Sequence, residues 1–290
     1  MPLNRERKKS NMNQTELREI TVNGLKRKYR VHFSSSETGL MSDSVVFLLH
    51  GRYADGKFME EMTGFSGMSD RYGFTAIYPD GLEKQWNDGR QEISFRKHQK
   101  EIINEFEFLN EILNDLQKRG KTFNSVFGTG ISNGGILLYK LLVEHPHFLN
   151  GAGIISAGCP DEFREVLETI SVSKLIIFQC TSDPIIPYNG GKIRFGRTEM
   201  GNVISTEELI KLLTHDMNGP NKEVFSGEDN LSFEKNSYNK DNSRKLIYFK
   251  ISGGGHIWPG SVIEFDEKIY GNSVKSLNAG FEMIKLFMEN

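Results

Sequence analysis

Residues 130–134 read Gly-Ile-Ser-Asn-Gly, which is the pattern G-x-S-x-G centred on Ser132. A serine in this pattern acts as a nucleophile when it occupies a sharp turn between a strand and a helix, because the turn lifts its hydroxyl clear of the sheet. The preceding segment 125–130 is typical of a strand, and 136–143 is apolar enough for a buried helix. The alternative is a structural or phosphate-binding glycine turn. The flanking strand and helix favour the nucleophile.

A serine nucleophile needs an acid and a histidine base, which follow it along the chain in that order in enzymes that use this turn. Asp183 comes directly after an apolar strand, whereas Asp161 has the position of a helix-starting residue and ranks second. His256 follows a strand and three glycines, which leave its loop free to bring the imidazole over the sheet edge. We therefore expect Ser132 as nucleophile, His256 as base and Asp183 as the acid that orients it.

Two backbone N–H groups are expected to stabilise the oxyanion of such a reaction. One belongs to Asn133, directly after the nucleophile, and the other comes from the loop after an early central strand. Here that strand is 45–49, and the loop begins His50-Gly51-Arg52, so the N–H of Arg52 is the second candidate. Gly51 allows a close approach of the backbone. We interpret His50 as a support for this loop and not as a second base.

Three aromatic residues are candidates for substrate binding. Trp86 and Trp258, the only tryptophans, both fall in glycine-containing loops, and Tyr53 follows the second oxyanion candidate. Packing of the loops onto the sheet explains the tryptophans equally well. The two cysteines, Cys159 and Cys180, are expected as free thiols, with one disulfide between them as the alternative.

No metal and no cofactor are expected. The sequence has no cluster of His, Cys, Asp or Glu at metal-ligand spacing, no G-x-G-x-x-G after the first strand and no P-loop.

The elements that must position these residues alternate between strands and helices, which favours an α/β fold with a mostly parallel central sheet and helices on both faces. The expected strands are 28–33, 45–49, 74–78, 125–130, 151–156, 175–179 and 246–251, and the expected helices are 100–119, 136–143, 205–215 and 281–287. The polar, asparagine-rich segment 218–244 is interpreted as an irregular surface excursion.

One catalytic domain is expected to cover residues 21–290, behind a flexible leader at 1–20. After the helix expected at 136–143, a stretch of only 16 residues, 158–173, lies between the strand expected at 151–156 and the one expected at 175–179. That length has room for one short helix, so no large cap domain is expected. An open site of this kind suits an ester on a bulky or polymeric scaffold.

The motifs together resemble those of an α/β-hydrolase family, the polyhydroxybutyrate depolymerase-like serine esterases, which are close to feruloyl and acetylxylan esterases. The resembling segments, in the family's order, are 45–51 (VVFLLHG), 71–90 (RYGFTAIYPDGLEKQWNDGR), 128–135 (GTGISNGG), 181–191 (TSDPIIPYNGG) and 253–260 (GGGHIWPG). The resemblance implies an α/β-hydrolase fold. It also implies cleavage of hydroxyalkanoate, acetyl or feruloyl esters through an acyl-enzyme, and the same three residues as nucleophile, acid and base.

The chain also departs from this family. Arg52-Tyr53 stands where a small or sulfur-containing residue is commoner, Cys180 stands where glycine is usual, and 103–106 lacks a pair of aspartates. A triad alone does not fix the leaving group, so a peptidase or a thioesterase remains an alternative. A non-catalytic hydrolase-like binding protein is a third.

Charge and hydropathy exclude two classes of partner. Lys and Arg total 36 and Asp and Glu total 38, which gives a net charge of −2. Binding of nucleic acid needs a cationic surface, and a nearly neutral chain gives no electrostatic argument for it. No apolar run approaches the roughly 18 residues of a membrane span. The basic N-terminus lacks the apolar stretch of a secretion signal, so the cytoplasm is expected. An extracellular location is the alternative, because members of the resembling family are often secreted.

Overall fold

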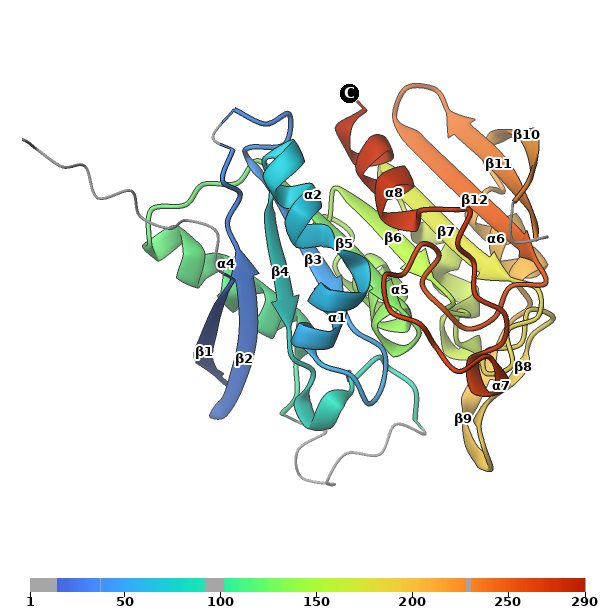
Figure 1. Ribbon diagram of the computed structural model, residues 1–290, viewed down its shortest axis with the longest axis horizontal. Helices are drawn as coiled ribbons and strands as arrows, with labels where there is room; N and C mark the ends of the chain where they lie inside the picture. Colours follow the sequence, from blue (N-terminus) through green and yellow to red (C-terminus); the bar gives the residue numbers. More distant parts are fainter. Residues whose placement is uncertain (1–14, 37, 92–101, 228–230, 290) are drawn as a thin grey trace, which may run out of the picture.

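The computed structural model describes residues 15–36, 38–91, 102–227 and 231–289. They form a ten-stranded sheet and a separate two-stranded hairpin (Figure 1). Across the main sheet the strands are β1 (Glu16–Val22), β2 (Leu25–His32), β4 (Thr75–Pro79), β3 (Ser44–Leu49), β5 (Ser125–Ile131), β6 (Gly151–Ile155), β7 (Lys174–Cys180), β12 (Arg244–Ser252), β11 (Ser232–Lys240) and β10 (Asn218–Ser226). The hairpin consists of β8 (Gly191–Phe195) and β9 (Thr198–Val203).

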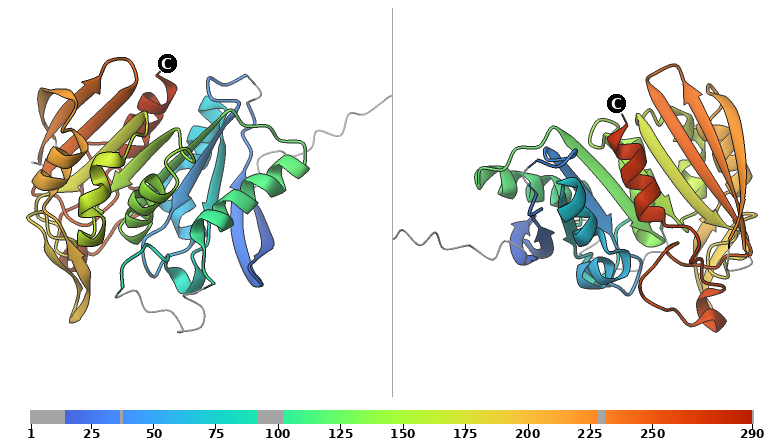
Figure 2. Two further views of the ribbon diagram at one scale, coloured as in Figure 1. Left: turned by 180° about the vertical axis from the view of Figure 1, so that it is seen from behind. Right: turned by 45° about the horizontal axis from the view of Figure 1, so that its top comes forward.

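The central strands β4, β3, β5, β6, β7 and β12 are parallel, and antiparallel strands flank them on both sides. The helical segments are α1 (Gly56–Thr63), α2 (Phe65–Tyr72), η1 (Leu82–Lys84), α4 (Glu105–Lys118), α5 (Asn133–Glu144), η2 (Asp161–Thr169), α6 (Thr206–Leu213), α7 (Glu267–Tyr270) and α8 (Ala279–Met288). Helices α1, α2 and α8 cover one face of the sheet, and α4, α5 and α6 cover the other (Figure 2). The predicted α/β architecture is confirmed.

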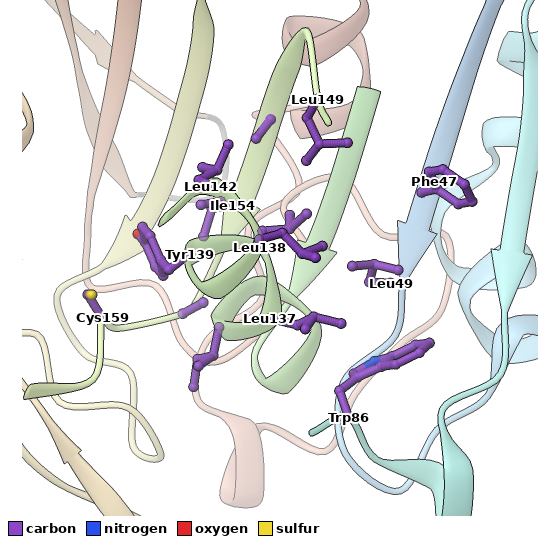
Figure 3. Packing of buried hydrophobic residues seen from close by; sticks show 14 of the residues in the cluster. Phe47, Leu49, Trp86, Leu137, Leu138, Tyr139, Leu142, Leu149, Ile154 and Cys159 are labelled. Atoms are coloured by element: carbon purple, nitrogen blue, oxygen red, sulfur yellow. The ribbon is translucent and has the colours of Figure 1, made fainter. Parts of the chain in front are cut away.

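Each face of the sheet has its own hydrophobic core. Helix α5 is buried along most of its length, as its nearly continuous apolar sequence predicts. Leu137, Leu138 and Leu142 of α5 pack between the sheet and the neighbouring segments (Figure 3). Because α5 is clamped in this way, the residue that precedes it, Ser132, has a fixed position at the carboxyl edge of the sheet.

The leader predicted at 1–20 is too long. Residues 1–14 lie outside the described residues, but β1 begins at Glu16 and pairs in register with β2, from Glu16 opposite Val31 to Val22 opposite Leu25. Asn23 and Gly24, with φ of 51° and 76°, form the two-residue turn between these strands. Asn-Gly favours such a turn because both residues tolerate positive φ.

The segment 218–244, predicted to be irregular, forms two strands instead. Strand β11 pairs with β12 along its whole length, from Ser232 opposite Ser252 to Lys240 opposite Arg244. Strand β10 pairs with β11 and forms the exposed edge of the sheet. Pairing with an ordered neighbour organises these polar residues even though their strand propensity is low.

Helix α4 is shorter than the helix predicted at 100–119. It begins after Asn104, whose side chain accepts a hydrogen bond from the N–H of Glu107, as an N-cap residue should. Residues 100 and 101 lie outside the described residues. Within the described residues no helix is long and apolar enough to cross a membrane.

Candidate active site

Ser132 lies in a sharp turn between the end of β5 and the start of α5. Its backbone has φ 55° and ψ −123°, a conformation that a residue with a side chain adopts only under strain. The glycines on either side are required by contact: a Cβ on Gly130 would lie 2.7 Å from the carbonyl carbon of Gly134. A Cβ on Gly134 would lie 2.4 Å from the carbonyl oxygen of Leu49. The G-x-S-x-G pattern therefore has the strand-to-helix context that the sequence predicts for it.

His256 and Asp183 meet after the ends of β12 and β7, which are neighbouring parallel strands. The Nδ1 of His256 is 2.8 Å from Oδ2 of Asp183. The other carboxylate oxygen, Oδ1, accepts hydrogen bonds of 2.8 Å from the N–H groups of Ile185 and Ile186. Both side chains are almost fully buried. Because both oxygens of Asp183 are engaged, the carboxylate is fixed and holds the imidazole in one orientation.

The loop that carries His256 is held by the segment around α7. The N–H of His256 donates to the carbonyl of Tyr270 over 2.6 Å, and the N–H of Gly255 donates to the carbonyl of Asn272 over 2.9 Å. A Cβ on Gly255 would lie 2.1 Å from the Tyr270 carbonyl oxygen, so the close approach requires glycine. The second candidate acid, Asp161, lies exposed at the start of η2.

The two predicted oxyanion donors belong to two segments that meet at Ser132. Asn133 is the first residue of α5, where backbone N–H groups have no partner within the helix. Gly51 is on the facing loop, and a Cβ there would lie 3.5 Å from the Cβ of Ser132. Arg52 follows it and lines the same pocket as Ser132. Neither Asn133 nor Arg52 donates its backbone N–H to another residue in the described part of the chain.

His50 supports this loop, as the sequence predicts. Its Nε2 accepts a hydrogen bond of 2.9 Å from the N–H of Gly81, so its Nδ1 carries the proton and donates to the Gly51 carbonyl over 2.7 Å. The carbonyl of His50 accepts from Nε1 of Trp86 over 2.8 Å, and the two rings lie 4.8 Å apart. Burial lowers the pKa of His50 to about 4.

This shifted pKa predicts a loss of stability in acid. Between about pH 6.5 and pH 4 the unfolded chain binds a proton at His50 and the folded chain does not. The free energy of unfolding should therefore fall by roughly 3 kcal/mol over this range through His50 alone. Urea unfolding of the wild type and of His50→Gln at several pH values isolates the effect, because the other titrating groups are common to both. Equal pH dependences would contradict it.

A buried polar network that the sequence analysis missed positions Asn133. Its side-chain oxygen accepts from the N–H of Trp86 over 2.7 Å, and its amide nitrogen donates to Asp88 over 2.6 Å. Asp88 is in turn paired with Arg90, and both are buried. The sequence signal for this network is the polar segment 85–90, Gln-Trp-Asn-Asp-Gly-Arg, which contains too few apolar residues for an ordinary core segment.

Ser132 and His256 line one pocket of about 360 Å³ at the carboxyl edge of the sheet. Its apolar walls come from α1, from the β8–β9 hairpin and from the segment around α7. Their side chains are Phe58, Met59, Met62, Phe195, Met200, Phe265 and Tyr270. Tyr53, a predicted substrate-binding residue, also lines the pocket and is 59% exposed.

The two tryptophans do not line this pocket, so that prediction is wrong. Trp86 is completely buried beneath the loop that begins at His50, where its indole N–H donates to the carbonyl of His50. Trp258 is 1% exposed and packs edge to face on Phe65, with ring centroids 6.1 Å apart. Both contribute to packing because the loops that carry them fold inward over the sheet. Cys159 and Cys180 are buried free thiols, as predicted.

Comparisons with known proteins agree with this architecture, although no family model matches the chain. The chain is 23% identical over 279 residues to a protein described as the putative esterase NocK of Nocardia uniformis subsp. tsuyamanensis. The match covers 91% of this chain and 80% of that protein. The structure is similar to an acetyl xylan esterase from Aspergillus awamori, with a TM-score of 0.59 and 13% identity over 94% of this chain and 100% of the other. A thermostable esterase aligns with a TM-score of 0.55 and 14% identity, over 95% of this chain and 62% of the other.

The chain has an α/β-hydrolase fold. In this fold, β6 and β7 are joined only by η2 and its short flanking loops, so no cap domain is inserted there, as predicted. The longer excursion after Asp183 supplies the β8–β9 hairpin and α6 before the chain returns to the sheet edge through β10 and β11. The hairpin gives the pocket a wall without closing it.

Proposed function

We propose that this α/β-hydrolase is a serine hydrolase that cleaves carboxylic esters. The observation that carries the proposal is the strained turn of Ser132 at a pocket that it shares with His256, whose imidazole is fixed by Asp183. The likeness to proteins described as esterases supports the same reaction class.

In the proposed mechanism, the Nε2 of His256 takes the proton of Ser132 as its Oγ attacks the ester carbonyl. The Nδ1–H of His256 donates to Asp183, which stabilises the imidazolium that forms. The N–H groups of Asn133 and Arg52 hold the oxyanion of the tetrahedral intermediate. His256 then returns the proton to the leaving alcohol, and water hydrolyses the acyl-enzyme by the same route.

The shape and lining of the pocket bear on the substrate. A volume of about 360 Å³ with phenylalanine and methionine walls accepts an acyl or aryl group larger than acetyl. The absence of a cap between β6 and β7 leaves room for an alcohol on a bulky or polymeric scaffold. Within the ester classes, these features favour a hydroxyalkanoate or feruloyl type over a simple acetyl ester.

The test combines active-site labelling with a substrate panel. A fluorophosphonate should label the wild type at Ser132, identified by peptide mass spectrometry. Aryl acetate, butyrate, 3-hydroxybutyrate and feruloyl esters should be hydrolysed, each compared with a matched thioester and anilide. Faster turnover of the thioesters or anilides would replace the proposed function by a thioesterase or a peptidase. Failure both to label and to hydrolyse any member would favour a non-catalytic binding protein.

A further inference from the structure

Arg52 lines the candidate active site, and within the described residues its guanidinium has no anionic partner. Arg52 is half-buried and lines the pocket beside Ser132. Its Nη1 donates to the sulfur of Met200 over 3.1 Å, which is a weak acceptor. Its Nε is buried and has no partner, and in the described part of the chain no carboxylate pairs with the guanidinium. The ring of Tyr53 lies 5.1 Å from the central carbon of the guanidinium and covers it from one side.

The other charged side chains of the pocket are already paired. Lys84 lies 3.3 Å from Asp55, which also caps α1 by accepting from the N–H of Phe58. His256 is paired with Asp183. Among the described residues that line the pocket, Arg52 therefore supplies one unneutralised positive charge, and the walls are mostly apolar. A cation in such surroundings loses hydration and recovers the loss only by pairing with an anion.

We propose that Arg52 binds a carboxylate carried by the substrate, an inference that rests on the proposed ester hydrolysis. The preferred substrates are then esters with a second, anionic end: half-esters of dicarboxylic acids, or esters of alcohols that bear a carboxylate. The planar fork of a guanidinium matches the two oxygens of a carboxylate. A neutral ester leaves its N–H groups unsatisfied in the pocket, so the site discriminates against it.

The position of Arg52 in the loop gives this contact a second consequence. Its backbone N–H is the proposed oxyanion donor, and its side chain meets the hairpin wall at Met200. A carboxylate bound to the guanidinium is therefore held by the same residue whose backbone N–H is proposed to bind the oxyanion of the reacting carbonyl. Such an anchor orients the ester before attack. Substitution of the side chain leaves the backbone N–H in place, which separates the two roles.

Two pairs of esters test the inference. The first pair is 4-nitrophenyl adipate, with a free carboxylate on the acyl side, and its methyl ester. The second is 4-acetoxybenzoate, with the carboxylate on the alcohol side, and its methyl ester. We expect the ratio of kcat/KM for the anionic and neutral members of one pair to fall roughly ten- to hundredfold in Arg52→Gln. The pair that responds identifies the side of the ester that carries the carboxylate.

Two further variants make the result specific. Arg52→Lys keeps the charge and should retain part of the preference. Arg194→Gln removes an exposed arginine of β8 that pairs with Glu199, so it changes the net charge equally and should leave both ratios within about twofold. Thermal unfolding shows that each variant is folded.

The possible results separate the inference from the function on which it rests. Unchanged ratios in Arg52→Gln, with the neutral esters still hydrolysed, would overturn the inference and leave the proposed function standing. An equal fall in Arg194→Gln would also overturn it, as an effect of net charge. No hydrolysis of any ester and no fluorophosphonate label in the wild type would overturn both.

Discussion

Replacement of Ser132 by alanine should lower kcat for aryl esters by at least about ten-thousandfold, because it removes the proposed nucleophile and retains the rest of the site. The fold should be unaffected. The helix that follows is held by its buried leucines, and the Ser132 side chain makes no capping hydrogen bond to it. Alanine keeps the Cβ and tolerates the same backbone turn about as well as serine. The measurements are steady-state kinetics on an aryl ester and thermal unfolding of both proteins.

The control for this prediction is Ser156→Ala. Ser156 is also buried, also follows a strand and also has a positive φ of 43°, but its hydroxyl contacts the carbonyl of Ile257 and it does not line the pocket. This variant should keep most of its activity. If Ser132→Ala retains more than a few per cent of wild-type turnover in a folded protein, Ser132 has no part in the mechanism.

The centre of the fold could be predicted from the sequence because each buried parallel strand is a continuous run of apolar residues. The run 45–49 appears in the structure as β3, in which every residue is buried, and 175–179 appears within β7. A strand buried on both faces needs apolar residues throughout, and such a run has few other interpretations. The candidate residues Ser132, Asp183 and His256 could be selected for the same reason, since each follows one of these strands.

The edges of the sheet could not be predicted in this way. In β10 every residue is exposed, so its sequence carries no pattern of burial. Its position depends on pairing with β11, a contact that the composition of either strand does not reveal. Strand β1, at the other edge, is an exception, because Asn23-Gly24 between alternating segments is a recognised hairpin signal.

In the site, the sequence located residues by their order along the chain but could not say which way their side chains face. Trp86 and Tyr53 both belong to loops at the carboxyl edge, yet Trp86 is completely buried and Tyr53 is largely exposed. The difference arises from packing: the indole donates to the carbonyl of His50 beneath the loop, whereas the backbone of Tyr53 turns outward with φ 70°. Such choices depend on three-dimensional contacts that spacing does not encode.

Replacement of Asp183 by asparagine should lower kcat/KM by about ten-thousandfold, through the wrong tautomer of His256. The two N–H groups of Ile185 and Ile186 require an acceptor at the position of Oδ1, so the amide oxygen of asparagine must occupy it. The amide NH₂ then faces Nδ1 of His256, where the wild type has Oδ2. An NH₂ group donates, so Nδ1 must accept and the proton moves to Nε2. Such an imidazole has no free lone pair for the proton of Ser132.

Asp161→Asn is the matched control, because Asp161 is the alternative acid and lies exposed at the start of η2. It should hydrolyse aryl esters at close to the wild-type rate. Asp183→Ala adds a further check, since it removes the NH₂ donor as well as the carboxylate. It lets neutral His256 keep the productive tautomer for part of the time, so it should be less impaired than Asp183→Asn. A crippled Asp161→Asn beside a nearly normal Asp183→Asn would show that the acid is Asp161. Full activity in both would remove the carboxylate, and with it the triad, from the mechanism.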